Sequence, residues 1–157
     1  MTEATARDLD RLREAIELAE NCPPSATFRV GAVITDAEGA VLATGYSGET
    51  DPHDHAEEAA IAKLPPGDPR LPAATIYSSL EPCSTRASRP LTCTRLILDA
   101  GIGRIVFAWR EPALFVDCVG AETLSAAGRT VIEVPALADL VRRTNSHLPG
   151  VAPGQDS

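Results

Sequence analysis

The chain has 157 residues and a net charge of −8, with 44% hydrophobic, 23% charged and 4% aromatic residues. This length fits one compact domain and leaves no room for a second full one. The hydrophobic content predicts a folded core, which must be mostly aliphatic because aromatic residues are scarce. The acidic balance disfavours sequence-independent binding to nucleic acid, because a phosphate polyanion would meet net repulsion.

The first elements are predicted to be a helix and a β-hairpin. Apolar residues recur at three- and four-residue steps over 6–20, which is the spacing of an amphipathic helix, and two prolines follow it. Two β-rich runs come next, at 30–35 and 40–46. The residues between them include the Asp and Gly that suit a tight turn. We expect these two strands to pair in antiparallel fashion.

The rest of the chain alternates helices and strands. The second helix is predicted from a run rich in Ala and Glu that ends at a proline-rich loop. Gly101 and Gly128 are placed to end two later helices. The elements predicted after the hairpin are helix 55–64, strand 74–80, helix 91–100, strand 104–109, helix 119–127, strand 130–134 and helix 137–148.

This order predicts an α/β fold, a three-layer α-β-α sandwich with a mixed five-stranded sheet. The hairpin supplies the antiparallel part, and the strand-helix-strand units of the second half supply the parallel part. The domain is expected to span 1–148. The Gly- and Pro-rich segment 149–157 is expected to be a disordered tail.

Four residues with metal or acid-base chemistry lie at the ends of predicted elements. His55 and Glu57 open the second helix, Cys83 follows the third strand, and Cys93 starts the third helix. One imidazole and two thiolates are good zinc ligands, and three protein ligands leave a fourth tetrahedral position for water, as in catalytic zinc sites. Glu57 lies two residues from His55, which suits contact with that water better than a second metal bond.

Each of these pieces also has a simpler interpretation. A solvated helix start would explain the His and Glu residues of 53–58 without any metal, and Cys83 could be a buried thiol, because free Cys often behaves as a small core hydrophobe. Disulfides are disfavoured if the compartment is reducing. The joint order, with each piece at an element boundary, favours the zinc site.

The pattern resembles the cytidine-deaminase-like superfamily, whose signature is His-x-Glu followed by Pro-Cys-x-x-Cys. Nine residues separate Cys83 from Cys93, where most of the superfamily has two. This longer gap, the run Leu-Glu-Pro-Cys-Ser at 80–84 and the run Ala-Gly-Ile-Gly-Arg-Ile-Val-Phe at 100–107 resemble the deaminase domains of riboflavin-biosynthesis enzymes, the diaminohydroxyphosphoribosylaminopyrimidine deaminases.

The resemblance implies a cytidine-deaminase-like fold, zinc as the cofactor and a homodimer or higher homo-oligomer. It also implies His55, Cys83 and Cys93 as the zinc ligands and Glu57 as the proton shuttle. In that chemistry zinc lowers the pKa of a bound water toward ~7, Glu57 moves protons, and ammonia leaves an amino-bearing ring carbon. The expected substrate is a small heterocycle.

Two kinds of residue are predicted to contact substrate. Some stand where this chain differs from the riboflavin-pathway deaminases, and others could interact with the heterocyclic ring of the substrate. Thr27 stands where that family usually has an Asn, and two arginines occupy the segment between the cysteines, where guanidinium groups could hold a phosphate or simply face solvent. His53 could touch substrate or be a loop residue, and two aromatic side chains could stack on a ring or pack in the core. The predicted contacts are Thr27, Phe28, His53, Arg86, Arg89 and Trp109.

The sequence leaves several functions open. The first is a zinc-dependent hydrolytic deaminase of an aminated pyrimidine, such as the riboflavin-pathway diaminopyrimidine ribosyl phosphate. A specialised nucleobase or nucleoside deaminase and an inactive zinc-binding interaction module are alternatives. A tRNA adenosine deaminase is disfavoured by the net charge and the long cysteine gap. Cys22 and Cys118 match no part of the motif and are expected to be structural thiols.

The expected location is the cytoplasm. No apolar run approaches the ~18 residues that a membrane helix needs, and the charged start at 1–13 lacks the apolar core of a signal peptide. We therefore expect no membrane partner.

Overall fold

A computed structural model describes residues 3–24, 27–84, 86, 89–110, 119–148 and 151. The predicted Cys118 thiol and all of the predicted tail except Val151 lie outside these residues. The helices are α1 Ala6–Leu18, α2 Ala56–Ala62, α3 Cys93–Ala100, α4 Gly120–Ala126 and α5 Ala138–Thr144. The strands are β1 Gly31–Thr35, β2 Val41–Tyr46, β3 Thr75–Leu80, β4 Arg104–Trp109 and β5 Thr130–Glu133. Short 3-10 turns cover Ala19–Asn21, Leu71–Ala73 and Pro135–Leu137.

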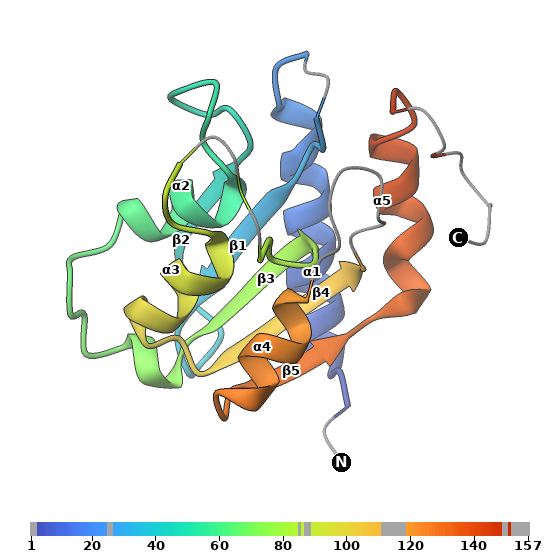
Figure 1. Ribbon diagram of the computed structural model, residues 1–157. Coiled ribbons are helices and arrows are strands. Elements are labelled where there is room, and N and C mark those ends of the chain that lie inside the picture. The colour runs from blue at the N-terminus through green and yellow to red at the C-terminus, as the bar shows by residue number, and fades with distance from the viewer. Residues whose placement is uncertain are drawn as a thin grey trace.

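The strands form one mixed five-stranded sheet in the order β2-β1-β3-β4-β5. β1 pairs antiparallel with β2 and β3, whereas β3, β4 and β5 run parallel to one another. In Figure 1, α2, α3 and α4 lie in front of the sheet and α1 lies behind it. α5 contacts α1 and completes that second layer. The predicted three-layer sandwich, hairpin and parallel half are therefore confirmed.

The core consists of apolar side chains between the sheet and its two helical layers. The central strands are buried along most of their length, which explains their almost continuous apolar sequences. Gly39 and Gly101 adopt the positive φ expected of the hairpin turn and the end of α3. Within the described residues, no helix is long and apolar enough to cross a membrane.

The predicted last helix, 137–148, is wrong at its carboxyl end, because α5 stops at Thr144. Asn145 follows it and is fully buried. Its side-chain amide donates to the Arg29 carbonyl at 3.1 Å and its side-chain oxygen accepts from the Arg29 backbone N–H at 2.6 Å. These bonds to a residue 116 positions away favour ending the helix there. The predicted 6–20 helix is likewise shorter, because its last two residues belong to a 3-10 turn.

A buried ion pair ties α1 to the sheet. Asp8 is 2% exposed and accepts hydrogen bonds from both Nη atoms of Arg104 at 2.7 and 2.6 Å, from Tyr77 Oη at 2.7 Å and from the Thr5 backbone N–H at 2.9 Å. Burial alone would raise the pKa of Asp8, but the Arg104 guanidinium and the other donors hold it well below its usual range. Asp8 is therefore ionised at neutral pH.

We expect Asp8→Asn to lower the free energy of unfolding by about 2–3 kcal/mol at pH 7, because it weakens charge-assisted bonds in a buried site. A carboxylate with a lowered folded-state pKa stabilises the fold above its unfolded pKa of about 4, and this contribution is lost as the pH falls toward the folded pKa. Urea unfolding should therefore show the difference between variant and wild type shrinking below about pH 4.

Asp10→Asn is the matched control, because the Asp10 side chain is 77% exposed and meets Arg13 only at 3.8 Å. It should change stability by less than about 0.5 kcal/mol. Equal losses in the two variants would contradict a special role for Asp8.

Candidate metal centre and active site

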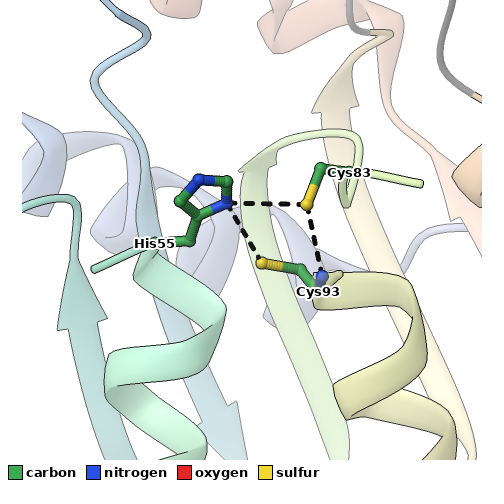
Figure 2. Close-up of side chains that lie close together, drawn as sticks. All are labelled: His55, Cys83 and Cys93. Atoms are coloured by element: carbon green, nitrogen blue, oxygen red, sulfur yellow. Dashed lines mark hydrogen bonds between the residues drawn. The ribbon is translucent and has the colours of Figure 1, made fainter. Parts of the chain in front are cut away.

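Three side chains from separate elements meet at one end of the sheet. His55 is the residue that caps the start of α2, Cys83 lies three residues beyond the end of β3, and Cys93 is the first residue of α3. Figure 2 shows these three side chains pointing toward one another. The predicted convergence at element ends is confirmed.

The distances within the cluster suit one shared metal ion. His55 Nδ1 lies 3.5 Å from Cys83 Sγ and 3.3 Å from Cys93 Sγ, and the potential ligand atoms all lie within 4.8 Å of one another. Both cysteines are buried and His55 is half-buried. One nitrogen and two sulfur donors form a ligand set that zinc prefers. His55, Cys83 and Cys93 are thus positioned to bind a zinc ion.

The electrostatics of the cluster favour a thiolate at Cys83. Hydrogen bonding from Cys93 and from His55 lowers the pKa of the Cys83 thiol to about 4, against the opposing effect of burial. The backbone N–H of Cys93, in the first turn of α3, also donates to Cys83 Sγ at 3.2 Å. The hydrogen bond to Cys83 and burial raise the pKa of Cys93 well above its usual value. One thiol of the pair is thus already ionised for metal binding at neutral pH.

Glu57 lies in the first turn of α2 and is 3% exposed. Burial, followed by the negative charge of Cys83, raises the pKa of its carboxyl group. Its own charge raises the pKa values of His55 and Cys93. The charge of Glu57 and the charges of the metal-binding side chains therefore influence one another.

Ser78, on β3, is the polar partner of Glu57. Its hydroxyl lies 3.1 Å from Glu57 Oε2 and 2.7 Å from the Leu80 carbonyl oxygen, and its side chain is fully buried. Sequence reasoning missed this residue. A signal was present, because two adjacent serines at 78 and 79 lie in a predicted strand, where neighbouring side chains point to opposite faces. The face that carries Ser78 is the one that faces α2.

The two arginines predicted to hold phosphate face carboxylates of the chain itself. Arg86 donates to Glu58 Oε1 at 2.7 Å, and Arg89 lies 3.0 Å from Glu58 Oε2 and 3.2 Å from both Asp51 Oδ1 and Asp54 Oδ1. Burial alone would raise the pKa of Glu58, but the hydrogen bonds from the two arginines lower it. A phosphate role for either arginine stays a prediction.

The other predicted substrate contacts are divided between core and surface. Phe28 and Trp109 are buried and pack against each other edge to face, with ring centroids 6.0 Å apart. Thr27 is exposed, and its carbonyl oxygen lies 2.9 Å from His147 Nε2. The His53 side chain is 65% exposed and lies 3.4 Å from Asp51. Contact of these four residues with substrate stays a prediction.

The sequence model of the cytidine and deoxycytidylate deaminase zinc-binding region matches residues 6–109. The chain belongs to this deaminase family. It is also 42% identical over 123 residues to a diaminohydroxyphosphoribosylaminopyrimidine deaminase from Schizosaccharomyces pombe, covering 76% of this chain and 30% of that protein. The resemblance inferred from the motif is therefore confirmed, and with it a zinc-binding deaminase domain.

Solved structures agree with this assignment. A crystal structure of an Aspergillus oryzae Rib2 deaminase superposes with a TM-score of 0.79 at 27% identity, covering 92% of this chain and 94% of that one. A diaminohydroxyphosphoribosylaminopyrimidine deaminase and reductase from Thermotoga maritima superposes with a TM-score of 0.72 at 31% identity, covering 88% of this chain and 39% of that one. The chain spans about a third of the length of the curated relatives it matches.

We expect one tightly bound zinc ion per chain, retained through extensive dialysis. A His55→Ala, Cys83→Ala, Cys93→Ala triple variant should lose it, because all three donor side chains are removed. Metal analysis of the dialysed proteins measures the zinc content of the wild type and of the triple variant.

Cys22→Ala is the matched control, because Cys22 is a buried thiol whose Sγ lies 3.5 Å from the Val30 carbonyl oxygen, outside the metal-binding cluster. It should keep its zinc. Stoichiometric zinc in the triple variant would show that the metal is held elsewhere.

Proposed function

We propose that the chain is a zinc-dependent hydrolytic deaminase of an aminated pyrimidine. The observation that carries this proposal is the convergence of His55, Cys83 and Cys93, together with the buried carboxyl group of Glu57 two residues after His55. A zinc ion bound there would supply the Lewis acidity that lowers the pKa of a water molecule toward ~7. A structural zinc module would need no such carboxyl group, so Glu57 supports an enzyme over an inactive binding module.

Glu57 would serve as the proton shuttle of this reaction. Its carboxylate accepts a proton from the water that attacks the amino-bearing ring carbon and delivers it to the ring nitrogen. It then takes the proton of the hydroxyl group now on that carbon and delivers it to the departing amine. Water is consumed, the amino group leaves as ammonia, and a carbonyl group replaces it on the ring. Burial raises the pKa of Glu57, which favours uptake of a proton by its carboxylate.

The substrate that we propose is the diaminopyrimidine ribosyl phosphate named in the activity of the Schizosaccharomyces pombe relative. The 42% identity supports it over other heterocycles. One observation favours a second candidate, an unphosphorylated nucleobase or nucleoside. Three carboxylates, those of Asp51, Asp54 and Glu58, more than offset the two arginines at 86 and 89, so the local charge offers a phosphate little attraction.

An ammonia-release screen of the zinc-loaded protein over pyrimidine, purine and riboflavin-pathway compounds tests the substrate. We expect the highest kcat/KM on the diaminopyrimidine ribosyl phosphate. The matched comparison is the same compound without its phosphate. Equal kinetics on both would support the unphosphorylated class, and no ammonia from any aminated heterocycle would contradict the proposed function.

Glu57→Gln should retain zinc and the wild-type far-UV circular dichroism spectrum while turnover falls ~10²-fold or more, because the amide keeps the shape of the side chain but cannot accept the proton. Steady-state ammonia release measures the loss. Glu17→Gln, at an exposed position of α1, is the control and should turn over like wild type. Wild-type turnover in Glu57→Gln would remove Glu57 from the mechanism.

The remaining expectations from the sequence stay predictions. They are the single domain over 1–148, the cytoplasmic location and the homo-oligomer. Leu91 is 45% exposed and precedes Cys93 by two residues. Val119 is 52% exposed, and its backbone N–H donates to the hydroxyl of Ser84, the residue after Cys83. These apolar side chains support a contact between copies close to the zinc site.

A further inference from the structure

The residue that carries this inference is Arg86, which lies between the two cysteine ligands in the chain. Its side chain is only 1% exposed. Its guanidinium group donates to the Leu91 carbonyl at 3.2 Å, to the His53 carbonyl at 2.6 Å and to Glu58 Oε1 at 2.7 Å. Leu91 precedes the second cysteine ligand by two residues, and His53 precedes the histidine ligand by two residues. One buried side chain thus joins the segments that carry different metal-binding residues.

Glu58 passes this connection to the histidine itself. The oxygen that accepts from Arg86 also accepts a hydrogen bond from the His55 backbone N–H at 3.3 Å, as part of the capping box of α2. The backbone of His55 is thereby held in the extended conformation of a helix cap, with φ −89° and ψ 156°. This conformation determines the direction in which the imidazole leaves the chain. A continuous path of hydrogen bonds therefore runs from Arg86 through Glu58 to the histidine ligand.

We propose that Arg86 is a positioning residue that, through Glu58, holds the cysteine-bearing and histidine-bearing segments in register for zinc. The inference deepens the proposed function and rests on its zinc site. Arg86 touches no reacting group in this proposal. Its effect is on the geometry and the free energy of metal binding, because ligands that are already in place lose less conformational entropy when the metal binds.

The spacing of the cysteines explains why such a tie is needed. A two-residue gap holds both thiols by local geometry, whereas the nine residues between Cys83 and Cys93 allow many more conformations. The entropic cost of fixing the ends of a segment rises with its length. The buried guanidinium group of Arg86 donates hydrogen bonds to three acceptors from within this segment, and these bonds offset the entropic cost of ordering it.

Arg89 is the less important of the two arginines for this purpose. Its side chain is 32% exposed, and its contacts with Asp51, Asp54 and Glu58 are therefore open to screening by water and salt. Arg86 is shielded from both. We therefore expect the effect on zinc binding to follow Arg86 and to depend little on ionic strength.

The experiment is a zinc competition titration of the full-length chain against a chromophoric chelator of known affinity. Arg86→Met keeps an unbranched apolar stem and removes the guanidinium group with its charge and its hydrogen bonds. We expect its zinc affinity to fall ~10–100-fold, the usual range for loss of a group that orients metal ligands. Arg86→Lys, which keeps the charge but cannot donate in all three directions, should show a smaller loss. Wild-type affinity in Arg86→Met would overturn the proposal.

Arg95→Met is the matched control. Arg95 lies on α3 two residues after Cys93, but its side chain is 63% exposed and forms an ion pair with Asp99 on the same helix. It should bind zinc like wild type. An equal loss in Arg95→Met and Arg86→Met would mean that any lost arginine near α3 weakens the site, and would overturn the specific role of Arg86.

A double-variant cycle tests the route through Glu58. If the two residues act as one path, Arg86→Met combined with Glu58→Gln should lose less zinc affinity than the two single losses added together. Additive losses would overturn the path. Should Arg86→Met fail to fold, Glu58→Gln alone serves, because it keeps an oxygen for the His55 N–H while removing the charge that pairs with Arg86. Wild-type zinc affinity in that variant would also overturn the proposal.

A second measurement separates positioning from general destabilisation. Cobalt(II) in place of zinc gives visible absorption bands that depend on ligand geometry. The Arg86→Lys protein should show altered bands while its far-UV circular dichroism matches wild type, and unchanged bands would contradict positioning. Neither measurement uses substrate. If the protein deaminated none of the compounds tested, the proposed function would be contradicted, but the zinc-binding results for Arg86 would still stand.

Discussion

The metal-binding cluster depends on two close backbone contacts, one between α2 and β2 and one between α4 and the segment after β3. Gly45 of β2 faces the first turns of α2, where an added Cβ would lie 2.4 Å from the Ala56 carbonyl oxygen. Ala56 directly follows His55, so a side chain at 45 would displace the helix start that presents the imidazole. Gly120 has the same role on the other side, because its Cβ would lie 2.0 Å from the Pro82 carbonyl oxygen, next to Cys83.

A buried carboxylate reinforces the second of these contacts. Glu81, in the Leu-Glu-Pro-Cys run, is 2% exposed and accepts a hydrogen bond from the Ala121 backbone N–H at 2.9 Å. It thereby holds the first turn of α4 beside the segment that leads to Cys83. The acidic residue of this motif thus supports the segment that carries Cys83 without belonging to the metal-binding cluster. Motif residues outside the ligand set can be explained by packing of this kind.

Local patterns in the sequence were enough to predict the architecture and the three residues that converge in the metal-binding cluster. The β-rich runs, the turn with Asp36 and Gly39 before β2 and the glycine after α3 are short-range signals. The element ends that carry His55, Cys83 and Cys93 follow from them. Partners far apart in the chain could not be predicted in this way. The end of α5 depends on Asn145 reaching Arg29, and Arg86 depends on a carboxylate 28 positions earlier. Guanidinium groups in a sequence indicate an anion, but only the fold shows that the nearest anions belong to the same chain.

The hydroxyl of Ser78 has one proton and two neighbouring acceptors, Glu57 Oε2 and the Leu80 carbonyl oxygen. With Glu57 ionised, the hydroxyl can donate to the carboxylate. With Glu57 protonated, the acid can donate to Ser78 Oγ while the hydroxyl donates to Leu80. A serine at this point therefore matches both charge states of the carboxyl group by rotation about a single C–O bond. The protein can follow the movement of a proton without moving a heavy atom of this pair. Alanine or valine at 78 would remove this partner from both charge states of Glu57.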